Sequence, residues 1–203
     1  MFAVCFLVVF SPVYLLTWII IKIVSPGPAI YTAKRVGLGG QLFNCYKFRS
    51  MRVDSGMVRL TTLENDNRIF PFGKFIRKVK IDEMPQMVNI LKGEMSVVGP
   101  RPEDKENADK VYVGEFKHLL DVKPGLTSTA SLYDYTQGGL YEDEELYEKE
   151  FLPKKLKLEL YDIKHRSFWY DIYIIIRTAW LILLKTCGKR KFEEPLSRLE
   201  RCL

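Results

Sequence analysis

The chain has 203 residues, with 31 lysines and arginines against 25 aspartates and glutamates, so its formal net charge is +6 at pH 7. This length suits one domain plus a membrane element. The basic excess suits anionic lipid, phosphates or nucleic acid, but no DNA- or RNA-binding motif is present, so nucleic acid is not an expected partner. The four cysteines are scattered without a Cys-x-x-Cys pair, which argues against a zinc site or a disulfide framework.

Residues 2–24 form an apolar segment in which Lys22 is the first ionisable side chain. A segment of about 20 apolar residues can cross a bilayer. Ser11-Pro12 lies in its middle, and proline kinks a helix because it removes a backbone donor and clashes with the preceding turn. Two alternatives stay open: a kinked spanning helix, or a re-entrant helix that returns to the same face. The cations from Lys22 to Arg35 place the C-terminal side in the cytoplasm.

The next segment has the pattern of a β-hairpin. Residues 29–36 and 41–49 are rich in aromatic and β-branched residues, and Gly-Leu-Gly-Gly at 37–40 is a turn signal. Strand alternation places Lys47 and Arg49 on one face of the second strand. Two cations on one face could hold a phosphate, although a solvated strand edge that discourages aggregation is the more common reason for such a pair.

Two adjacent carboxylates, Asp82 and Glu83, follow a run of three cations and precede an apolar pattern at helical spacing. We expect Asp82 to be the N-cap of a helix that has Pro85 in its first turn and ends near Gly93. The positive end of the helix dipole would favour the ionised form of Asp82, and an ionised, positioned carboxylate can attack phosphorus. An Asp-Glu pair that only caps a helix is the ordinary alternative.

The sequence Gly99-Pro100-Arg101-Pro102 predicts a rigid, non-helical element that presents its arginine with little conformational freedom. A pre-organised guanidinium is suited to clamp a phosphate. An exposed arginine in an ordinary proline-rich turn is the alternative. The polar residues at 50–73, before this element, are expected to form a loop.

The C-terminal half contains two helical patterns, at residues 103–123 and 146–165. Residues 131–141, between them, are rich in loop and aromatic residues, so we expect a loop there. Residues 192–203 form a charged tail that is expected to be disordered.

Residues 168–184 are strongly apolar, but Asp171 and Arg177 interrupt them and leave no uncharged stretch long enough to span a bilayer. A helix that lies in the membrane interface fits better, with Trp169 and Trp180 at the depth of the lipid headgroups. A helix buried in a soluble core is the alternative.

Together these motifs occur in the order seen in the bacterial sugar transferase family, the monotopic phosphoglycosyl transferases, which the chain resembles from about Phe6 to Thr186. The Asp-Glu and Gly-Pro-Arg-Pro motifs carry the resemblance most specifically. The chain is similar to the small form that has a catalytic domain only. The matching segments are the proline-broken N-terminal segment and residues 27–31, 34–37, 46–51, 81–86, 89–96, 98–102 and 122–127.

The resemblance implies transfer of a phosphosugar from a UDP-sugar to polyprenol (undecaprenyl) phosphate with release of UMP. This step initiates glycoconjugate assembly, of a polysaccharide or a glycoprotein, at the cytoplasmic face of the bacterial inner membrane, upstream of further membrane glycosyltransferases. It also implies a ping-pong mechanism in which Asp82 is the nucleophile that attacks the β-phosphorus and Glu83 is its partner, both near a Mg²⁺ ion. The residues that resemble the family's phosphate-binding residues are Lys47, Arg77, Pro100 and Arg101.

Further residues take supporting roles by the same resemblance. Glu159 stands where the family often has an Asp, with Asp162 as a nearby alternative, and Arg49 is a second candidate for a supporting role. Ser11 and Pro12 resemble the break of the family's re-entrant membrane helix, which favours the re-entrant alternative.

The expected fold class is therefore α+β and predominantly helical, with a small β-hairpin and amphipathic interfacial helices. The expected organisation is a re-entrant membrane helix at residues 1–24, a cytoplasmic-face catalytic domain with interfacial helices at 25–191, and the tail at 192–203.

A UDP-sugar brings two phosphates, so its site needs a divalent cation and several positive side chains. Mg²⁺ binds carboxylate and phosphate oxygens, and Asp82 and Glu83 can supply the carboxylates. Two other classes of function stay open. One is a non-enzymatic, membrane-anchored interaction module, and the other is a UDP-sugar hydrolase that releases UMP without lipid. The identity of the sugar does not follow from the sequence.

Overall fold

The computed structural model describes residues 2–53, 68–138, 141, 144–189 and 192. The chain divides into two compact units. The first contains residues 1–34 and 43–95, and the second contains residues 35–42 and 96–203. The described residues are mostly helical and include two pairs of strands, so the predicted α+β class with a small hairpin is confirmed.

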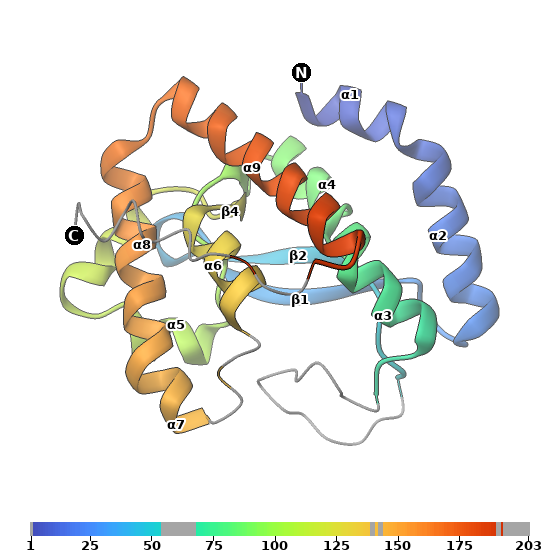
Figure 1. Ribbon diagram of the computed structural model, residues 1–203, viewed down its shortest axis with the longest axis horizontal. Coiled ribbons are helices and arrows are strands. Elements are labelled where there is room, and N and C mark those ends of the chain that lie inside the picture. The colour runs from blue at the N-terminus through green and yellow to red at the C-terminus, as the bar shows by residue number, and fades with distance from the viewer. Residues whose placement is uncertain (1, 54–67, 139–140, 142–143, 190–191, 193–203) are drawn as a thin grey trace. The chain divides into compact units, whose positions relative to one another are not determined.

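Two helices form the N-terminal apolar segment, α1 (Phe2–Val9) and α2 (Ser11–Val24), which follow one another across a bend of 62° (Figure 1). The bend confirms the predicted break, because Pro12 at the start of α2 cannot continue the hydrogen-bond ladder of α1. The hydroxyl of Ser11 donates to the carbonyl of Val8 at 2.8 Å and so satisfies a carbonyl near the break. Among the described residues, no single helix has the length and apolar composition of a span, but this bent pair together does.

One face of α2 belongs to the hydrophobic core of the first unit. Ile21 is fully buried and Thr17 nearly so, whereas Leu15, Trp18 and Ile23 are exposed. The core cluster around Ile21 is made by α2, the hairpin and α3 (Pro71–Lys78), and its buried members are Ile21, Ala29, Phe48, Phe70 and Ile76.

The predicted hairpin is confirmed by two paired strands, β1 (Ile30–Val36) and β2 (Leu42–Phe48). A short 3-10 turn, η1 (Leu38–Gly40), joins them. The predicted loop is partly wrong: Met51 forms a β-bridge with Ile69, and α3 already begins at Pro71. The rest of that loop, residues 54–67, lies outside the described residues.

The segment after α3 differs from the expected helix start. Lys80 has a left-handed backbone with φ of 59°, and the single 3-10 turn η2 (Ile81–Glu83) follows it. The next helix, α4 (Gln86–Leu91), has Pro85 at its N-cap position, so the prediction that Asp82 caps a helix is wrong. The predicted end of this helix is correct, since α4 stops two residues before Gly93, which has φ of 77°.

In the second unit, the Gly-Pro-Arg-Pro segment follows a short strand, β3 (Ser96–Val98), and is non-helical as predicted. This strand pairs in parallel with β4 (Gly125–Thr127), a pairing that the sequence did not indicate. The two backbones approach so closely that a Cβ atom on Gly125 would lie 2.1 Å from the amide nitrogen of Gly99. Both glycines are therefore required by a strand contact, in addition to the turns they flank.

Two predictions of secondary structure in the second unit need correction, one of a helix and one of a loop. The pattern at 103–123 forms two separate pieces, α5 (Lys105–Val111) and the 3-10 helix η3 (Gly114–Asp121). The aromatic segment expected to be a loop is mostly helix α6 (Thr129–Gln137), which Ser128 caps by accepting a bond from the amide of Ser131. Its aromatic content reflects packing, because Tyr133 is fully buried and stacks on Phe151 at 4.7 Å between ring centroids.

The chain continues through the short α7 (Glu144–Leu146), the π-helical turn η5 (Tyr147–Phe151) and α8 (Leu152–His165), which confirms the predicted helix there. The last helix, α9 (Phe168–Thr186), follows α8 at a sharp change of direction (Figure 1). It is not enclosed in a core, because several of its large apolar side chains are exposed. They are Phe168, Trp169, Tyr173, Ile176, Trp180 and Leu183. The predicted tail lies outside the described residues, apart from Phe192.

Candidate active site

Asp82 and Glu83, hereafter the carboxylate pair, lie in the turn η2 with only 7% and 8% of their surface exposed. Lys47 from β2 reaches this turn, and its Nζ lies 3.2 Å from Oε1 of Glu83. The Nζ of Lys80 lies 3.6 Å from the same oxygen. The structure thus brings together three of the residues predicted for the site region and surrounds Glu83 with two ammonium groups.

Asp82 is the less satisfied carboxylate of the two. Its Oδ1 atom is buried and has no hydrogen-bond partner among the described residues. Burial raises the pKa of Asp82 and the neighbouring Glu83 raises it further, whereas Lys47, Lys80 and Arg77 lower it. The expectation that a helix dipole holds Asp82 ionised is therefore wrong, because no helix begins at this residue. Its negative charge depends on neighbouring cations.

Arg77, near the end of α3, lies close enough to act electrostatically on Asp82. Its guanidinium is 3.4 Å from the hydroxyl of Ser50, just after β2. The helix itself is held against this segment, since a Cβ atom on Gly73 would lie 2.1 Å from the carbonyl oxygen of Ser50. The position of Arg77 is therefore set by a close contact between α3 and the chain that follows β2.

Arg49 is not a solvated edge residue, since only 5% of its surface is exposed. Its guanidinium donates to the carbonyls of Ser25 and Pro26, the latter at 2.8 Å. Arg49 thereby ties the end of the N-terminal helix segment to the strand that carries Lys47. In this structure it acts as a link between segments.

Sequence reasoning missed Asn89 of α4, which is fully buried. Its Oδ1 accepts from the amide of Tyr46 at 3.1 Å, and its Nδ2 donates to the carbonyl of Asn44 and to Glu94, both at 2.7 Å. These bonds fix β2 against α4 on both sides of Cys45, next to Lys47. The one signal in the sequence is a polar residue within the apolar run of a short helix, and it does not reveal the partners.

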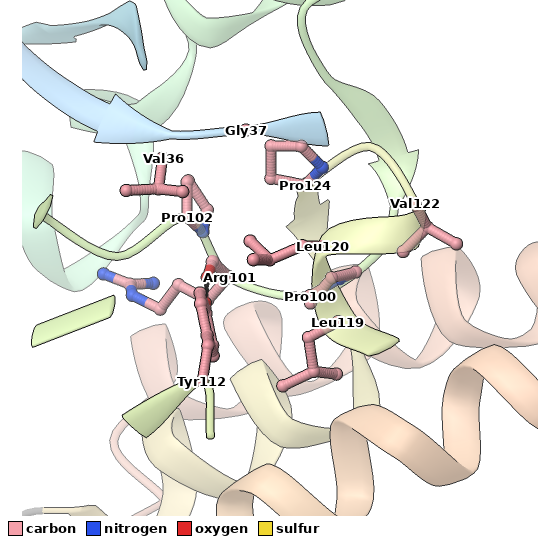
Figure 2. Close-up of a pocket in the computed structure, with 10 residues that line it drawn as sticks. All are labelled: Val36, Gly37, Pro100, Arg101, Pro102, Tyr112, Leu119, Leu120, Val122 and Pro124. Carbon is pink, nitrogen blue, oxygen red and sulfur yellow. Dashed lines mark hydrogen bonds between the residues drawn. The ribbon is translucent and has the colours of Figure 1, made fainter. Parts of the chain in front are cut away.

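The remaining predicted site residues lie in the second unit. Pro100 and Arg101 line a small pocket together with Tyr112 and apolar residues (Figure 2). The Arg101 amide donates to Oε1 of Glu159 at 3.2 Å, and its carbonyl accepts from the hydroxyl of Tyr112 at 3.4 Å. Figure 2 shows the Arg101 guanidinium on the side away from Leu119. The backbone of Arg101, the predicted phosphate clamp, is thus held by hydrogen bonds at both its amide and its carbonyl.

A buried ion pair extends this contact. Lys155, one helical turn before Glu159 on α8, donates to Glu103 at 2.8 Å and is only 4% exposed. Burial raises the pKa of Glu159 to about 7, although Lys155 opposes the shift. Burial acts to raise the pKa of Glu103, but the charge and hydrogen bond of Lys155, together with Arg101 and Arg35, leave the pKa of that carboxyl lowered. The sequence did not identify Lys155 and Glu103, which are 52 residues apart.

Asp162, the alternative to Glu159, has other partners. Its carboxylate accepts from the amide of Thr129 at 2.7 Å and from the hydroxyl of Tyr170 at 2.6 Å. These bonds join α8 to the start of α6 and to α9. Of the two carboxylates, Glu159 is the one that contacts the Gly-Pro-Arg-Pro segment.

The described part of the chain contains no cluster of three or more histidine, cysteine, aspartate or glutamate residues with metal-ligand geometry. The carboxylate pair nevertheless offers two adjacent carboxylates, one of which has a buried oxygen without a hydrogen-bond partner in the described part of the chain. Mg²⁺ commonly takes one or two protein carboxylates and completes its coordination with water and substrate phosphates. The donor set at η2 fits an ion that is shared with a phosphorylated ligand.

Comparison with known proteins places these residues in a family context. A family model described as bacterial sugar transferase matches residues 1–185. The chain is 39% identical over 175 residues to the galactosyl transferase CpsE of Streptococcus agalactiae serotype III, covering 80% of this chain and 36% of that protein.

Two further relatives are similar at comparable levels. One is the UDP-glucose:undecaprenyl-phosphate glucose-1-phosphate transferase of Xanthomonas campestris pv. campestris, 38% identical over 168 residues, with 80% of this chain and 33% of that protein covered. The other is the UDP-N-acetylgalactosamine-undecaprenyl-phosphate N-acetylgalactosaminephosphotransferase of Aeromonas hydrophila, 36% identical over 180 residues, with 86% and 40% covered. The chain thus spans between 33% and 40% of the length of these three relatives.

The raised pKa of Glu159 gives a testable pH dependence. Between its ordinary value of 4.5 and about 7, the folded state keeps the proton that the unfolded state has lost. Stability from this group is therefore fully present below pH 4.5 and is lost as pH rises towards 7. We expect Glu159→Gln to remove this part of the pH dependence and to raise the melting temperature most at pH 8.

The measurement is a series of melting temperatures from pH 4.5 to 8 for the wild type and the variant, with Glu115→Gln as an exposed control. The groups that act on Glu159 are Lys155, Glu103, Asp162 and the Arg101 amide, and all remain in the variant. A difference between the two curves that does not change with pH would contradict the assignment.

Proposed function

Because the chain belongs to the bacterial sugar transferase family, we propose that it moves a phosphosugar from a UDP-sugar to polyprenol phosphate and releases UMP. The observation that carries this proposal is the buried carboxylate pair with Lys47, Lys80 and Arg77 acting on it. The names of two relatives specify a UDP-sugar donor and an undecaprenyl-phosphate acceptor, and we extend these substrate classes to this chain. The product would be the starting point for glycoconjugate assembly by downstream membrane glycosyltransferases.

The proposed reaction has two displacement steps at one phosphorus. In the first, a carboxylate oxygen of Asp82 bonds to the β-phosphorus, the bond to the bridging oxygen breaks, and UMP leaves with the electron pair. In the second, a phosphate oxygen of the polyprenol phosphate bonds to the same phosphorus and the Asp82 carboxylate leaves. The acceptor then carries a diphosphate-linked sugar, and the carboxylate is restored.

The side chains around the pair have separate tasks in this proposal. Lys47, Lys80 and Arg77 offset the negative charge of two phosphates that approach two carboxylates. Glu83, held by Lys47 at 3.2 Å, keeps that ammonium at the turn. Arg101 is proposed as a further phosphate ligand, because the bonds of its amide and carbonyl fix its backbone in advance.

We also propose Mg²⁺ as the cofactor, held by Asp82 and Glu83 together with donor phosphate oxygens. When bound, the ion would supply positive charge for the departing phosphate. Two observations support this proposal: the Oδ1 of Asp82 has no partner among the residues that the structure describes, and the pKa of Asp82 is raised. A cation there would offset both.

For location, we propose that α1 and α2 form a re-entrant helix in the bacterial inner membrane and that the remainder lies at the cytoplasmic face. The bend of 62° at Ser11-Pro12 and the exposed apolar side chains of both helices support this arrangement. The aromatic face of α9, with Trp169 77% and Trp180 58% exposed, suits the headgroup region.

The nucleophile is tested by covalent labelling. We expect the wild type, incubated with a UDP-sugar labelled in its sugar and without acceptor, to release UMP and retain the label. Asp82→Asn and Asp82→Ala should lose both signals by a factor of roughly 10³ or more, because both variants lack the carboxylate oxygen that is proposed to bond to the β-phosphorus. A panel of UDP-sugars would identify the donor.

The matched control is Asp109→Asn, which removes an exposed carboxylate that pairs with Lys105 on the surface. A labelled adduct in the Asp82 variants would contradict the assignment of Asp82 as the nucleophile. Continuous release of UMP by the wild type without lipid and without an adduct would instead indicate a hydrolase.

The proposed metal is tested by thermal stability in the presence of UDP. We expect MgCl₂ to raise the melting temperature of the wild type, since a ligand at 100 times its Kd stabilises by about 2.7 kcal/mol. The rise should be lost in Asp82→Asn and reversed by EDTA. NaCl at equal ionic strength controls for screening, and equal shifts in both proteins would exclude Asp82 as a ligand.

Membrane topology is tested with a single added cysteine before Met1, in a variant whose native cysteines are serines. For a re-entrant helix, a membrane-impermeant maleimide should label this cysteine in inverted vesicles but not in spheroplasts. Labelling from the outside alone would show that the helix pair spans the membrane.

A further inference from the structure

Tyr14 of α2 connects the N-terminal helix pair to the turn that carries the carboxylate pair. Its hydroxyl donates to the carbonyl of Met84, the residue directly after Glu83 and 70 positions away in sequence. We propose that Tyr14 is a positioning residue that fixes this turn, and that formation of the phosphosugar-enzyme thereby depends on the bend between α1 and α2. The consequence for the reaction rests on the proposed function.

The side chain of Tyr14 contacts two elements of the site at once. Its hydroxyl bonds to the chain just after η2, and its ring lies 5.5 Å from the ring of Phe48, measured between centroids. Phe48 is 3% exposed and directly follows Lys47. One residue of the apolar helix pair thus contacts both the residue directly after the turn that holds Asp82 and the strand that holds Lys47.

The turn has few bonds of its own, so an outside contact matters for its position. It begins at Lys80, which has φ of 59°, a conformation that costs energy in a residue other than glycine. Its internal bonds are those of isolated 3-10 turns, Glu83 to Lys80 at 3.3 Å and Met84 to Ile81 at 3.1 Å. The Met84 carbonyl then accepts from the Met87 amide at 3.0 Å as well as from Tyr14.

Tyr14 also lies so close to the break that a change in the bend would move its side chain. It is two residues after Pro12, and its amide bonds to the carbonyl of Phe10, the residue at the break. On the other side of the break, α1 packs against α4, the helix that follows the turn. One arm of the bent pair thus packs against α4 and the other bonds to the residue after the turn, so the angle between the arms affects where the hydroxyl of Tyr14 can lie.

The contact also explains a hydroxyl in an otherwise apolar helix. A half-buried phenol needs a partner, and the next residue, Leu15, is exposed like most of this helix. If Tyr14 only filled the core, its ring would suffice and phenylalanine would serve equally. The function of the hydroxyl can therefore be separated from that of the ring.

The test is Tyr14→Phe, which removes one oxygen and keeps the ring on Phe48. UMP release is measured in a single turnover without acceptor, with the protein in lipid nanodiscs. We expect a rate at saturating UDP-sugar about tenfold lower, with unchanged affinity for UDP-sugar and a nearly unchanged melting temperature. The matched control is Tyr31→Phe, which removes the hydroxyl of a 54% exposed tyrosine in the same unit and should react as the wild type does.

A second variant, Pro12→Ala, keeps the hydroxyl and alters the bend. It should also slow UMP release, and it should add little further loss in the Tyr14→Phe background, because both changes break one connection. Independent multiplication of the two effects would overturn the inference, as would a wild-type rate for Tyr14→Phe.

Hydrogen exchange at the amides of Glu83, Met84 and Met87 gives a readout that does not depend on activity. We expect exchange there to accelerate at least several-fold in Tyr14→Phe and in Pro12→Ala, and to stay unchanged in Tyr31→Phe. If the wild type releases no UMP, the proposed function fails, whereas the exchange rates still decide whether Tyr14 fixes the turn. Unchanged exchange in both variants would refute the positioning role.

Discussion

The burial of two adjacent carboxylates is the constraint on which the first unit depends. Asp82 and Glu83 lose most of their hydration and repel one another, and each effect disfavours ionisation. Only nearby cations offset this cost, so Lys47 must be brought from a distant strand to 3.2 Å from Glu83. The buried polar bonds of Arg49 and Asn89 then have a clear purpose, because they hold that strand in place. A site of this kind is costly for stability but suited to bind a cation or a phosphate.

The second unit also buries charged side chains, but there a lysine is enclosed by carboxylates. Lys155 is buried between two carboxylates, Glu103 and Glu159, and pairs directly with the first. A buried ion pair gives little net stability, because the desolvation penalty offsets most of the attraction. It does fix the geometry, because any rearrangement would leave a buried charge without its partner. What it fixes here is the backbone of Arg101 and the residues that follow it.

The sequence predicted the features that depend on local chemistry. Pro12 was sufficient to predict the break, and Gly-Leu-Gly-Gly was sufficient to predict the hairpin turn. Predictions failed where distant contacts decide: Asp82 has the composition of an N-cap, but the left-handed Lys80 starts a tight turn in its place. The backbone partners of Asn89 and Arg49 lie 23 to 45 residues away, and no local pattern encodes such separations. The candidate site residues were therefore identified through the family motifs, whereas the hydrogen bonds that link the elements around Lys47 were not predictable.

The N-terminal helix pair is part of the core that shapes the site. Ile21 of α2 is fully buried, because it lies in the same cluster as Phe48 and Ile76, with Ile81 packed against that cluster. Those three residues are the immediate neighbours of Lys47, Arg77 and Asp82. The elements that carry Lys47, Arg77 and Asp82 thus each pack the adjacent apolar residue into the cluster that contains Ile21 of α2. Removal of α2 would open this cluster, so whatever environment seats the helix also acts on the spacing of the charges.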